Sequence, residues 1–164
     1  MTNHDFLTFD FALTASRSSA KASTTIKKAK GSSAQLPELR KWPKIDVSNI
    51  TQVTREMVQR ISENDELGIF SKPVIEAHPT IADAYLNVIE TPIDLRTIEE
   101  ERVNIYNSIQ GLQDDLVLMF RNCCTFNANT DFWEIAKTQW EDINQVFFDV
   151  CEELGVLLPR HWKP

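Results

Sequence analysis

Apolar positions in the second half of the chain repeat at helical spacing. In the stretch that ends at Asn127 they recur at steps of three and four residues, which places them on one face of an α-helix. These positions are Ile109, Leu112, Leu116, Met119, Phe120 and Cys123. Residues 128–131 are turn formers, and a second helical pattern starts at Phe132. The sequence therefore predicts helices over 108–126 and 132–154, with Asn127 at their junction.

Two further patterns predict helices over residues 48–66 and 94–103. The first has its apolar face at Ile50, Val53, Met57 and Ile61. Either Ser48 or Thr51 is the expected N-cap of the first helix, and Asp94 is the expected N-cap of the second. Four helices with one long early connection predict an all-α helical bundle.

The long connection, residues 68–94, combines Pro73, Pro79 and Pro92 with many apolar residues. A loop of this length inside a compact domain is unusual and is most often functional. Its apolar content predicts packing on the helices, with a short helix near residues 80–89. A stiff apolar loop across a bundle favours a preformed pocket.

Length and charge divide the chain into three parts. With 164 residues and 42% apolar composition, we expect one domain over residues 46–158, a disordered tail over 1–45 and a short C-terminal tail over 159–164. Packing is expected to begin near Asp46, and residues 1–40 are expected to add nothing to stability.

The two main parts differ in charge. Residues 1–45 hold eight Lys/Arg and three Asp/Glu, whereas the remainder holds nine Lys/Arg and twenty-one Asp/Glu. An acidic domain attracts basic peptides, and the basic tail is expected to bind nucleic acid at most weakly. Plain solvation of these charges is the simpler interpretation. Since the sequence lacks an eighteen-residue apolar run and a secretion signal, we expect a soluble intracellular protein without membrane association.

The sequence offers few catalytic or metal-binding candidates. Its three cysteines, Cys123, Cys124 and Cys151, form no Cys-x-x-Cys and fall within helical patterns, where cysteine acts as a small apolar residue. No phosphate-binding glycine loop or nucleophile–base set is present. We therefore expect no catalytic residue, metal or cofactor. Asn127 remains the chief candidate, because its amide can cap a helix or bind a ligand.

An ordered set of short motifs between Phe70 and Leu154 resembles the bromodomain family. The motifs are Phe70-Ser-Lys-Pro-Val74, Ala84-Tyr85, Val88-Ile89, Thr91-Pro-Ile-Asp-Leu-Arg-Thr-Ile98, Tyr106, Ser108, Asp114-Asp115-Leu-Val-Leu-Met-Phe, Asn122-Cys123, Phe126-Asn127 and Ala136. The resemblance implies a left-handed four-helix bundle that binds acetylated lysine. It also implies a non-catalytic reader of histone tails or other chromatin proteins, acting in the nucleus within a larger chromatin complex.

The resemblance also implies the binding residues. Asn127 is then the residue that binds the acetyl group, and Tyr85 acts through a water. The remaining implied site residues are Phe70 as the shelf aromatic, Val74 as a wall, Phe132 or Trp133 at the mouth, and Ile69 and Phe126 nearby. The usual Trp-Pro-Phe shelf is replaced here by Gly68-Ile69-Phe70, so the groove beside the pocket is expected to be less aromatic.

Two other classes of function remain open. One is a helical interaction scaffold with a closed or filled pocket. The other is a targeting module of a larger chromatin enzyme, whose activity would lie in parts not present in this sequence.

Overall fold

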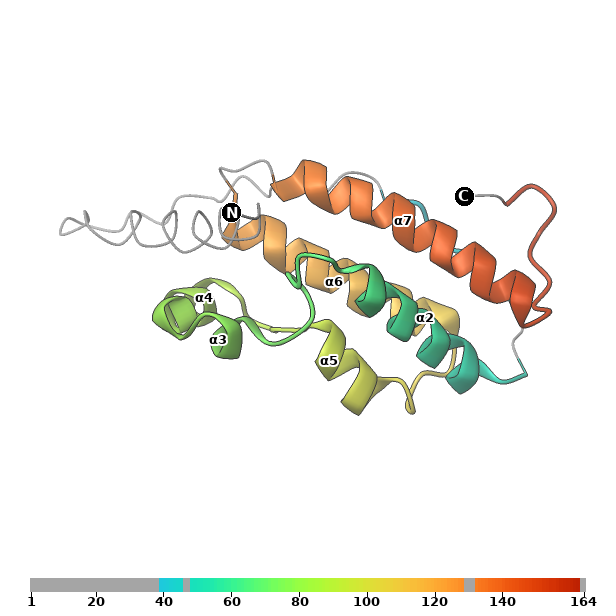
Figure 1. Ribbon diagram of the computed structural model, residues 1–164, viewed down its shortest axis with the longest axis horizontal. Helices are drawn as coiled ribbons and strands as arrows, with labels where there is room; N and C mark the ends of the chain where they lie inside the picture. Colours follow the sequence, from blue (N-terminus) through green and yellow to red (C-terminus); the bar gives the residue numbers. More distant parts are fainter. Residues whose placement is uncertain (1–38, 46–47, 129–131, 163–164) are drawn as a thin grey trace.

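The computed structural model describes residues 39–45, 48–128 and 132–162, and all of the regular structure in these ranges is helical (Figure 1). The elements are α2 (Ile50–Asn64), α3 (Val74–Ala77), the 3₁₀ turn η1 (Pro79–Ile81), α4 (Ala82–Val88), α5 (Leu95–Thr97), the π-helical turn η2 (Ile98–Arg102), α6 (Ile109–Phe126) and α7 (Phe132–Glu153). The predicted all-α class is confirmed, and three of the four predicted helices are found within two residues of their expected ends. The predicted helix over 94–103 is found as the short α5 continued by the π-helical turn η2. No helix in the described ranges is long and apolar enough to span a membrane.

The core lies between α2, α6 and α7, with α5 and η2 closing one side. Met57 and Val58 of α2, Leu116 of α6 and Phe147 of α7 are fully buried. Most of the predicted apolar positions are buried or partly buried, but Leu154, at the predicted end of the last helix, is 37% exposed. The reason is that α7 ends at Glu153, so Leu154 lies outside the helical face.

Three helix ends are fixed by side chains or by glycine. The side chain of Asn49 accepts a hydrogen bond from the Gln52 amide, so the predicted caps Ser48 and Thr51 are wrong. Asp94 caps α5 as predicted, accepting from the Thr97 amide at 3.1 Å. Gly155 follows α7 with a φ of 68°, and the next amide bonds back to Cys151 O at 2.7 Å, as a glycine C-cap requires.

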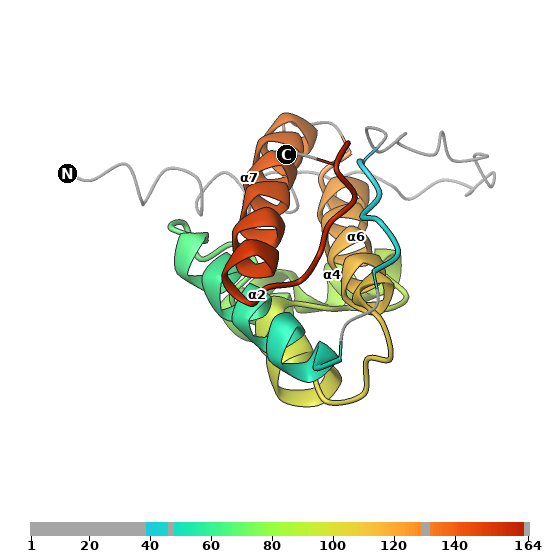
Figure 2. The same cartoon turned by 90° about the vertical axis from the view of Figure 1, so that its right-hand side faces the viewer.

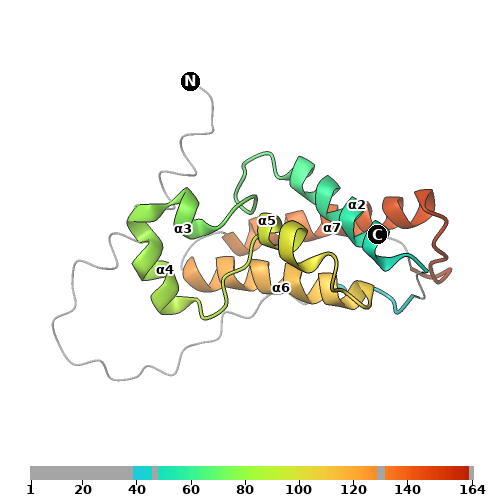
Figure 3. The same cartoon turned by 90° about the horizontal axis from the view of Figure 1, so that it is seen from below.

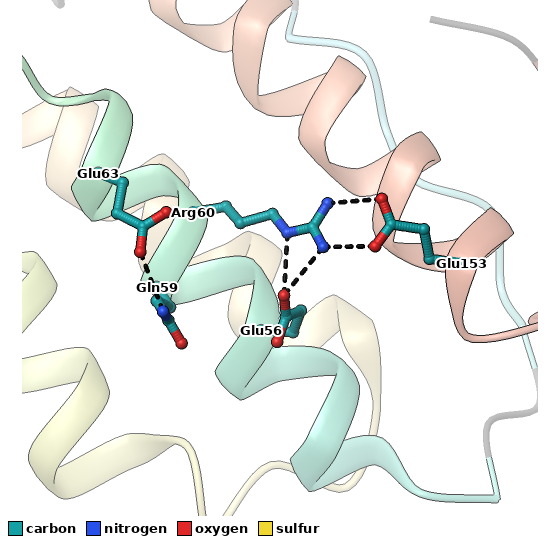
Figure 4. Close-up of polar contacts among 5 residues, drawn as sticks. All are labelled: Glu56, Gln59, Arg60, Glu63 and Glu153. Carbon is teal, nitrogen blue, oxygen red and sulfur yellow. Dashed lines mark hydrogen bonds and ion pairs between the residues drawn. The ribbon is translucent and has the colours of Figure 1, made fainter.

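The ion pairs between α2 and α7 lie at the surface. Arg60 of α2 contacts Glu56 one turn earlier and also Glu153 of α7, at 3.0 Å from Nη1 to Oε1 (Figure 4). Because all three side chains are partly or largely exposed to solvent, the network is expected to contribute little to stability. The buried apolar contacts hold the two helices together.

The core extends beyond the expected domain limits at both ends. Trp42 is buried, its ring stacks on Phe147 with centroids 4.6 Å apart, and its indole N–H donates to Asn144 Oδ1 at 2.9 Å. Trp162 packs edge-on against the same Phe147 ring, at 4.9 Å between centroids. Packing therefore begins before Asp46, as Figure 2 shows for the segment beside α6. A single tryptophan next to proline creates no periodic pattern, so the sequence gives little sign of this.

We predict that Trp42→Ala lowers the free energy of unfolding by about 3–5 kcal/mol, because it removes a large buried aromatic and leaves Asn144 without its indole donor. Urea denaturation of Trp42→Ala checks this expectation.

Removal of residues 1–38 is expected to leave the melting temperature unchanged. Removal of residues 1–40 is expected to lower the melting temperature, because it also removes the Arg40 carbonyl, which accepts from Gln113 Nε2 at 3.1 Å. Thermal denaturation of the two truncated chains checks these expectations.

Gly111 is required by close packing at the start of α6. A Cβ at this position would lie 2.8 Å from Cδ1 of the Tyr106 ring. The ring cannot move easily, because its hydroxyl donates to the buried Asp115 carboxylate at 2.5 Å, and Arg102 bonds to both oxygens of that carboxylate. The helix therefore tolerates a weak helix former where alanine would clash.

Gly111→Ala is accordingly expected to destabilise the protein by about 1–2 kcal/mol, since the overpacking cost exceeds the gain in helix propensity. Asp114→Ala, on the exposed face of the same helix, is the matched control and is expected to change stability little. An alanine at 111 that raised the unfolding midpoint would contradict the proposed clash with Tyr106.

Candidate functional site

A pocket of about 370 Å³, counting its open mouth, lies beside the C-terminal half of α6 under the segment 68–94. Its lining residues are Ile69, Phe70, Lys72, Val74, Tyr85, Ile93, Asp94, Met119, Cys123 and Asn127. Figure 3 shows α3 and α4 at the end of the bundle where α6 ends. One wall is therefore helical and the other is the long connection.

The start of the connection is fixed by Asp65, just after α2. Its carboxylate accepts from the Ile69 amide at 3.1 Å and from the Phe70 amide at 2.8 Å. The chain can turn back on itself because Gly68 has a φ of 63°, a conformation that glycine adopts without strain. Burial raises the pKa of the Asp65 carboxyl, while the amide donors oppose that rise. These bonds place Ile69 and Phe70 over the pocket.

The far end of the connection is tied to the bundle at two points. The side-chain amide of buried Asn122, in α6, donates to the Thr91 carbonyl at 2.7 Å. The Leu95 amide donates to the Phe70 carbonyl at 2.8 Å, which joins the two ends of the connection. The segment is thus held in place on α6, and the pocket is formed before any ligand arrives.

Asn127 is the C-cap residue of α6 and is also part of the pocket wall. It is buried, and both its backbone amide and its side-chain Nδ2 donate to the Cys123 carbonyl, at 3.0 and 2.9 Å. Asn127 therefore caps the helix, and its side-chain amide also lies in the wall of the pocket. The side-chain bond to the Cys123 carbonyl orients the amide, and its nitrogen also lies 3.9 Å from Cys123 Sγ.

Aromatic rings form much of the remaining wall. Tyr85 is buried and packs edge-on against Phe126, with ring centroids 5.2 Å apart. Phe70 packs edge-on against Phe120 at 4.9 Å. Burial raises the pKa of the Tyr85 hydroxyl to about 12, so this group remains protonated at neutral pH and can donate a hydrogen bond.

The charged and sulfur groups of the lining are constrained. Both oxygens of Asp94 accept from Thr97, one from its amide and one from its hydroxyl. Exposed Lys72 contributes an ammonium to the same lining. Burial raises the pKa of Cys123 to about 12, so its thiol remains protonated at neutral pH. Among the described residues, no group of three His, Cys, Asp or Glu is arranged to bind a metal.

The structure brings five of the eight predicted site residues together in the lining, namely Asn127, Tyr85, Val74, Phe70 and Ile69. Phe126 instead packs behind Tyr85. Phe132 and Trp133 belong to α7, but their side chains lie outside the described part of the structure.

The prediction did not include Lys72, Ile93, Asp94, Met119 and Cys123 as lining residues. Two of them could have been predicted from the sequence. Met119 and Cys123 precede Asn127 by eight and four residues, a spacing that places all three on one face of α6.

Comparison with known proteins identifies the family. The model of the family described as Bromodomain matches residues 54–138, more than half of the chain. The chain belongs to the bromodomain family. Membership supports an acetyl-lysine reader module of chromatin proteins, a class of module that is generally non-catalytic.

This bromodomain is similar to several curated proteins. It is 29% identical over 101 residues to Bromodomain-containing protein 7 of Gallus gallus, covering 60% of this chain and 15% of that protein. It is 38% identical over 80 residues to an ankyrin repeat, bromo and BTB domain-containing protein of Dictyostelium discoideum, covering 48% and 10%. It is 41% identical over 44 residues to the SWR1 complex bromodomain subunit bdf1 of Schizosaccharomyces pombe, covering 26% and 8%. The match spans no more than 15% of these relatives.

We predict that Asp65→Asn loosens the pocket wall of this bromodomain. An asparagine keeps one acceptor but replaces the other with a donor, so one of the Ile69 and Phe70 amides loses its partner at a cost of about 1–3 kcal/mol. Amide hydrogen exchange followed by NMR should show faster exchange at one of these two amides at least. Glu66→Gln, at the exposed neighbouring acid, is the control and should leave both rates unchanged.

Proposed function

We propose that the pocket binds the acetylated side chain of a lysine in a chromatin protein, with Asn127 Nδ2 donating a hydrogen bond to the acetyl oxygen. The observation that supports this most strongly is the position of the Asn127 amide. It lies in the wall of a pocket and is oriented by its bond to the Cys123 carbonyl. A capping asparagine at a solvent-exposed helix end would have no such pocket beside it.

The chemistry of acetylation fits this wall. Acetylation converts the lysine ammonium into a neutral amide with a methyl group. An ammonium entering the pocket would lose its water, at a cost of several kcal/mol, and the one carboxylate in the lining, Asp94, is already bonded to Thr97. The neutral amide requires only a donor for its oxygen, since its methyl group suits an apolar wall.

Other residues have proposed roles that follow from their positions. Phe70, Val74 and Ile93 contact the methyl group and the aliphatic chain of the ligand. The Tyr85 hydroxyl, protonated at neutral pH, donates to a water that also bonds the acetyl oxygen. One side chain and a few flanking contacts supply little area, so the dissociation constant is expected to lie on the order of micromolar to sub-millimolar.

The wider setting is also a proposal. The ligand is an acetylated histone tail or another acetylated chromatin protein, and the protein acts in the nucleus within a larger chromatin complex. The chain is divided into a basic N-terminal tail and a bromodomain whose core includes Trp42 and Trp162. The scaffold alternative is disfavoured by the pocket itself, which no described side chain fills.

Asn127→Ala is expected to abolish binding of an acetylated histone-tail peptide, because the acetyl oxygen would be buried without a donor. Tyr85→Phe is expected to weaken binding less, since a water can partly bond to other groups. Isothermal titration calorimetry with acetylated and unacetylated peptides measures both effects, and circular dichroism verifies folding.

Asn107→Ala, an exposed asparagine at the start of α6, is the matched control and should bind like wild type. If the Asn127 variant retained wild-type affinity, the proposed role of its amide would be wrong. If the wild-type protein bound no acetylated peptide, the scaffold alternative would be favoured.

A further inference from the structure

The segment that leads into the fold lies along α6 in a defined direction. The Pro43 carbonyl accepts from Gln110 Nε2 at 3.0 Å, and three residues earlier the Arg40 carbonyl accepts from Gln113 Nε2 at 3.1 Å. The Trp42 amide donates to Gln113 Oε1 at 3.2 Å. From residue 43 toward the N-terminus, the chain therefore runs toward the C-terminal end of α6, as can be traced in Figure 2. Asn127 and the candidate pocket lie at that end.

The remaining distance to the pocket is short. Gln113 and Asn127 are fourteen residues apart, which corresponds to about 21 Å along a helix and to faces only about 40° apart. Lys30 precedes Arg40 by ten residues and Lys28 by twelve. Fully extended, these stretches span about 33 and 40 Å. For a flexible coil of ten to twelve residues, the root-mean-square span is about 16–21 Å, close to the distance required.

The charges of the two segments are complementary. Residues 17–30 contain five basic residues and no acidic ones, three of them in the cluster Lys27-Lys28-Ala29-Lys30. The segment 68–94, which covers the pocket, contains four acidic residues and one lysine. Glu76 pairs with Arg96, and Asp94 is bonded to Thr97. The exposed carboxylates of Asp83 and Glu90 are therefore the ones that can attract the cluster. Acetylation of one lysine in the cluster leaves two ammonium groups that can face this acidic segment.

We propose that this chain supplies a ligand for its own pocket: Lys28, or its neighbours Lys27 and Lys30, enters the pocket in the same molecule once acetylated. The proposal rests on the proposed acetyl-lysine function. The modification requires an acetyl thioester and a separate lysine acetyltransferase. The lysine amine attacks the thioester carbonyl, a C–N bond replaces the C–S bond, and a thiol is released with the proton lost by the amine.

The length of the linker between the lysine cluster and Arg40 determines how strongly the tail competes with an added peptide. A ligand on a linker whose span matches the site has an effective concentration in the millimolar range. With an intrinsic dissociation constant on the order of micromolar to 100 µM, the tail occupies the pocket most of the time. A peptide added from solution then competes with the tail, and its apparent affinity falls by about tenfold or more.

The test uses the full chain with Nε-acetyl-lysine installed at position 28 by genetic code expansion. A fluorescent acetylated histone-tail peptide serves as the probe, and its affinity is measured for three proteins: unmodified, acetylated at Lys28 and acetylated at Lys41. Lys41 is the matched control. It carries the same modification and is exposed, but it is held beside Gln113 by its neighbours and cannot reach the pocket.

We expect acetylation at Lys28 to weaken probe binding about tenfold or more, independently of protein concentration, and acetylation at Lys41 to have no effect. Equal affinity for all three proteins would overturn the inference while leaving the proposed function intact. A loss that grew with protein concentration would overturn binding within one molecule, since it would indicate binding between molecules. If the unmodified protein did not bind the probe, the proposed function would fail, and this inference with it.

Discussion

The pocket depends on the attachment of one long, proline-containing connection to the side of a helical bundle. An apolar segment of this kind needs partners for its backbone groups when it is buried. Asp65 holds its start, Asn122 holds its end through Thr91, and the Phe70 carbonyl receives the Leu95 amide. Without these bonds, residues 68–94 would not form a fixed wall of the pocket, and Tyr85 and Val74 would not be positioned opposite α6.

The end of α6 serves stability and proposed function through the same atoms. A helix must satisfy its last carbonyls, and the Asn127 side chain does so for Cys123. The same bond orients the amide in the pocket wall. The tail segment shares this helix, because residues 40–43 bond to Gln110 and Gln113. One helix therefore positions the proposed binding group, a wall of the pocket and the segment that leads into the fold.

Sequence periodicity predicted the parts of the fold in which one face is repeatedly buried, such as α6 and α7. It also located Asn127, because turn formers directly follow the apolar pattern. Isolated contacts were not predictable in this way. Trp42 and Trp162 bury single rings from irregular segments, and Gly111 is explained only by the Tyr106 ring packed against it. Five expected site residues line the pocket, whereas Lys72 and Ile93 were missed because their contact with it arises from how the loop folds onto α6.

A crystal structure of the protein with an acetylated histone-tail peptide tests the central claim most directly. The account predicts the acetyl group in the pocket between Val74, Tyr85 and Asn127, with its oxygen at hydrogen-bonding distance, about 2.9 Å, from Asn127 Nδ2. The bond from that nitrogen to the Cys123 carbonyl should remain in place. A peptide bound on another surface, or an acetyl group in this pocket with the Asn127 amide turned away from it, would contradict the account.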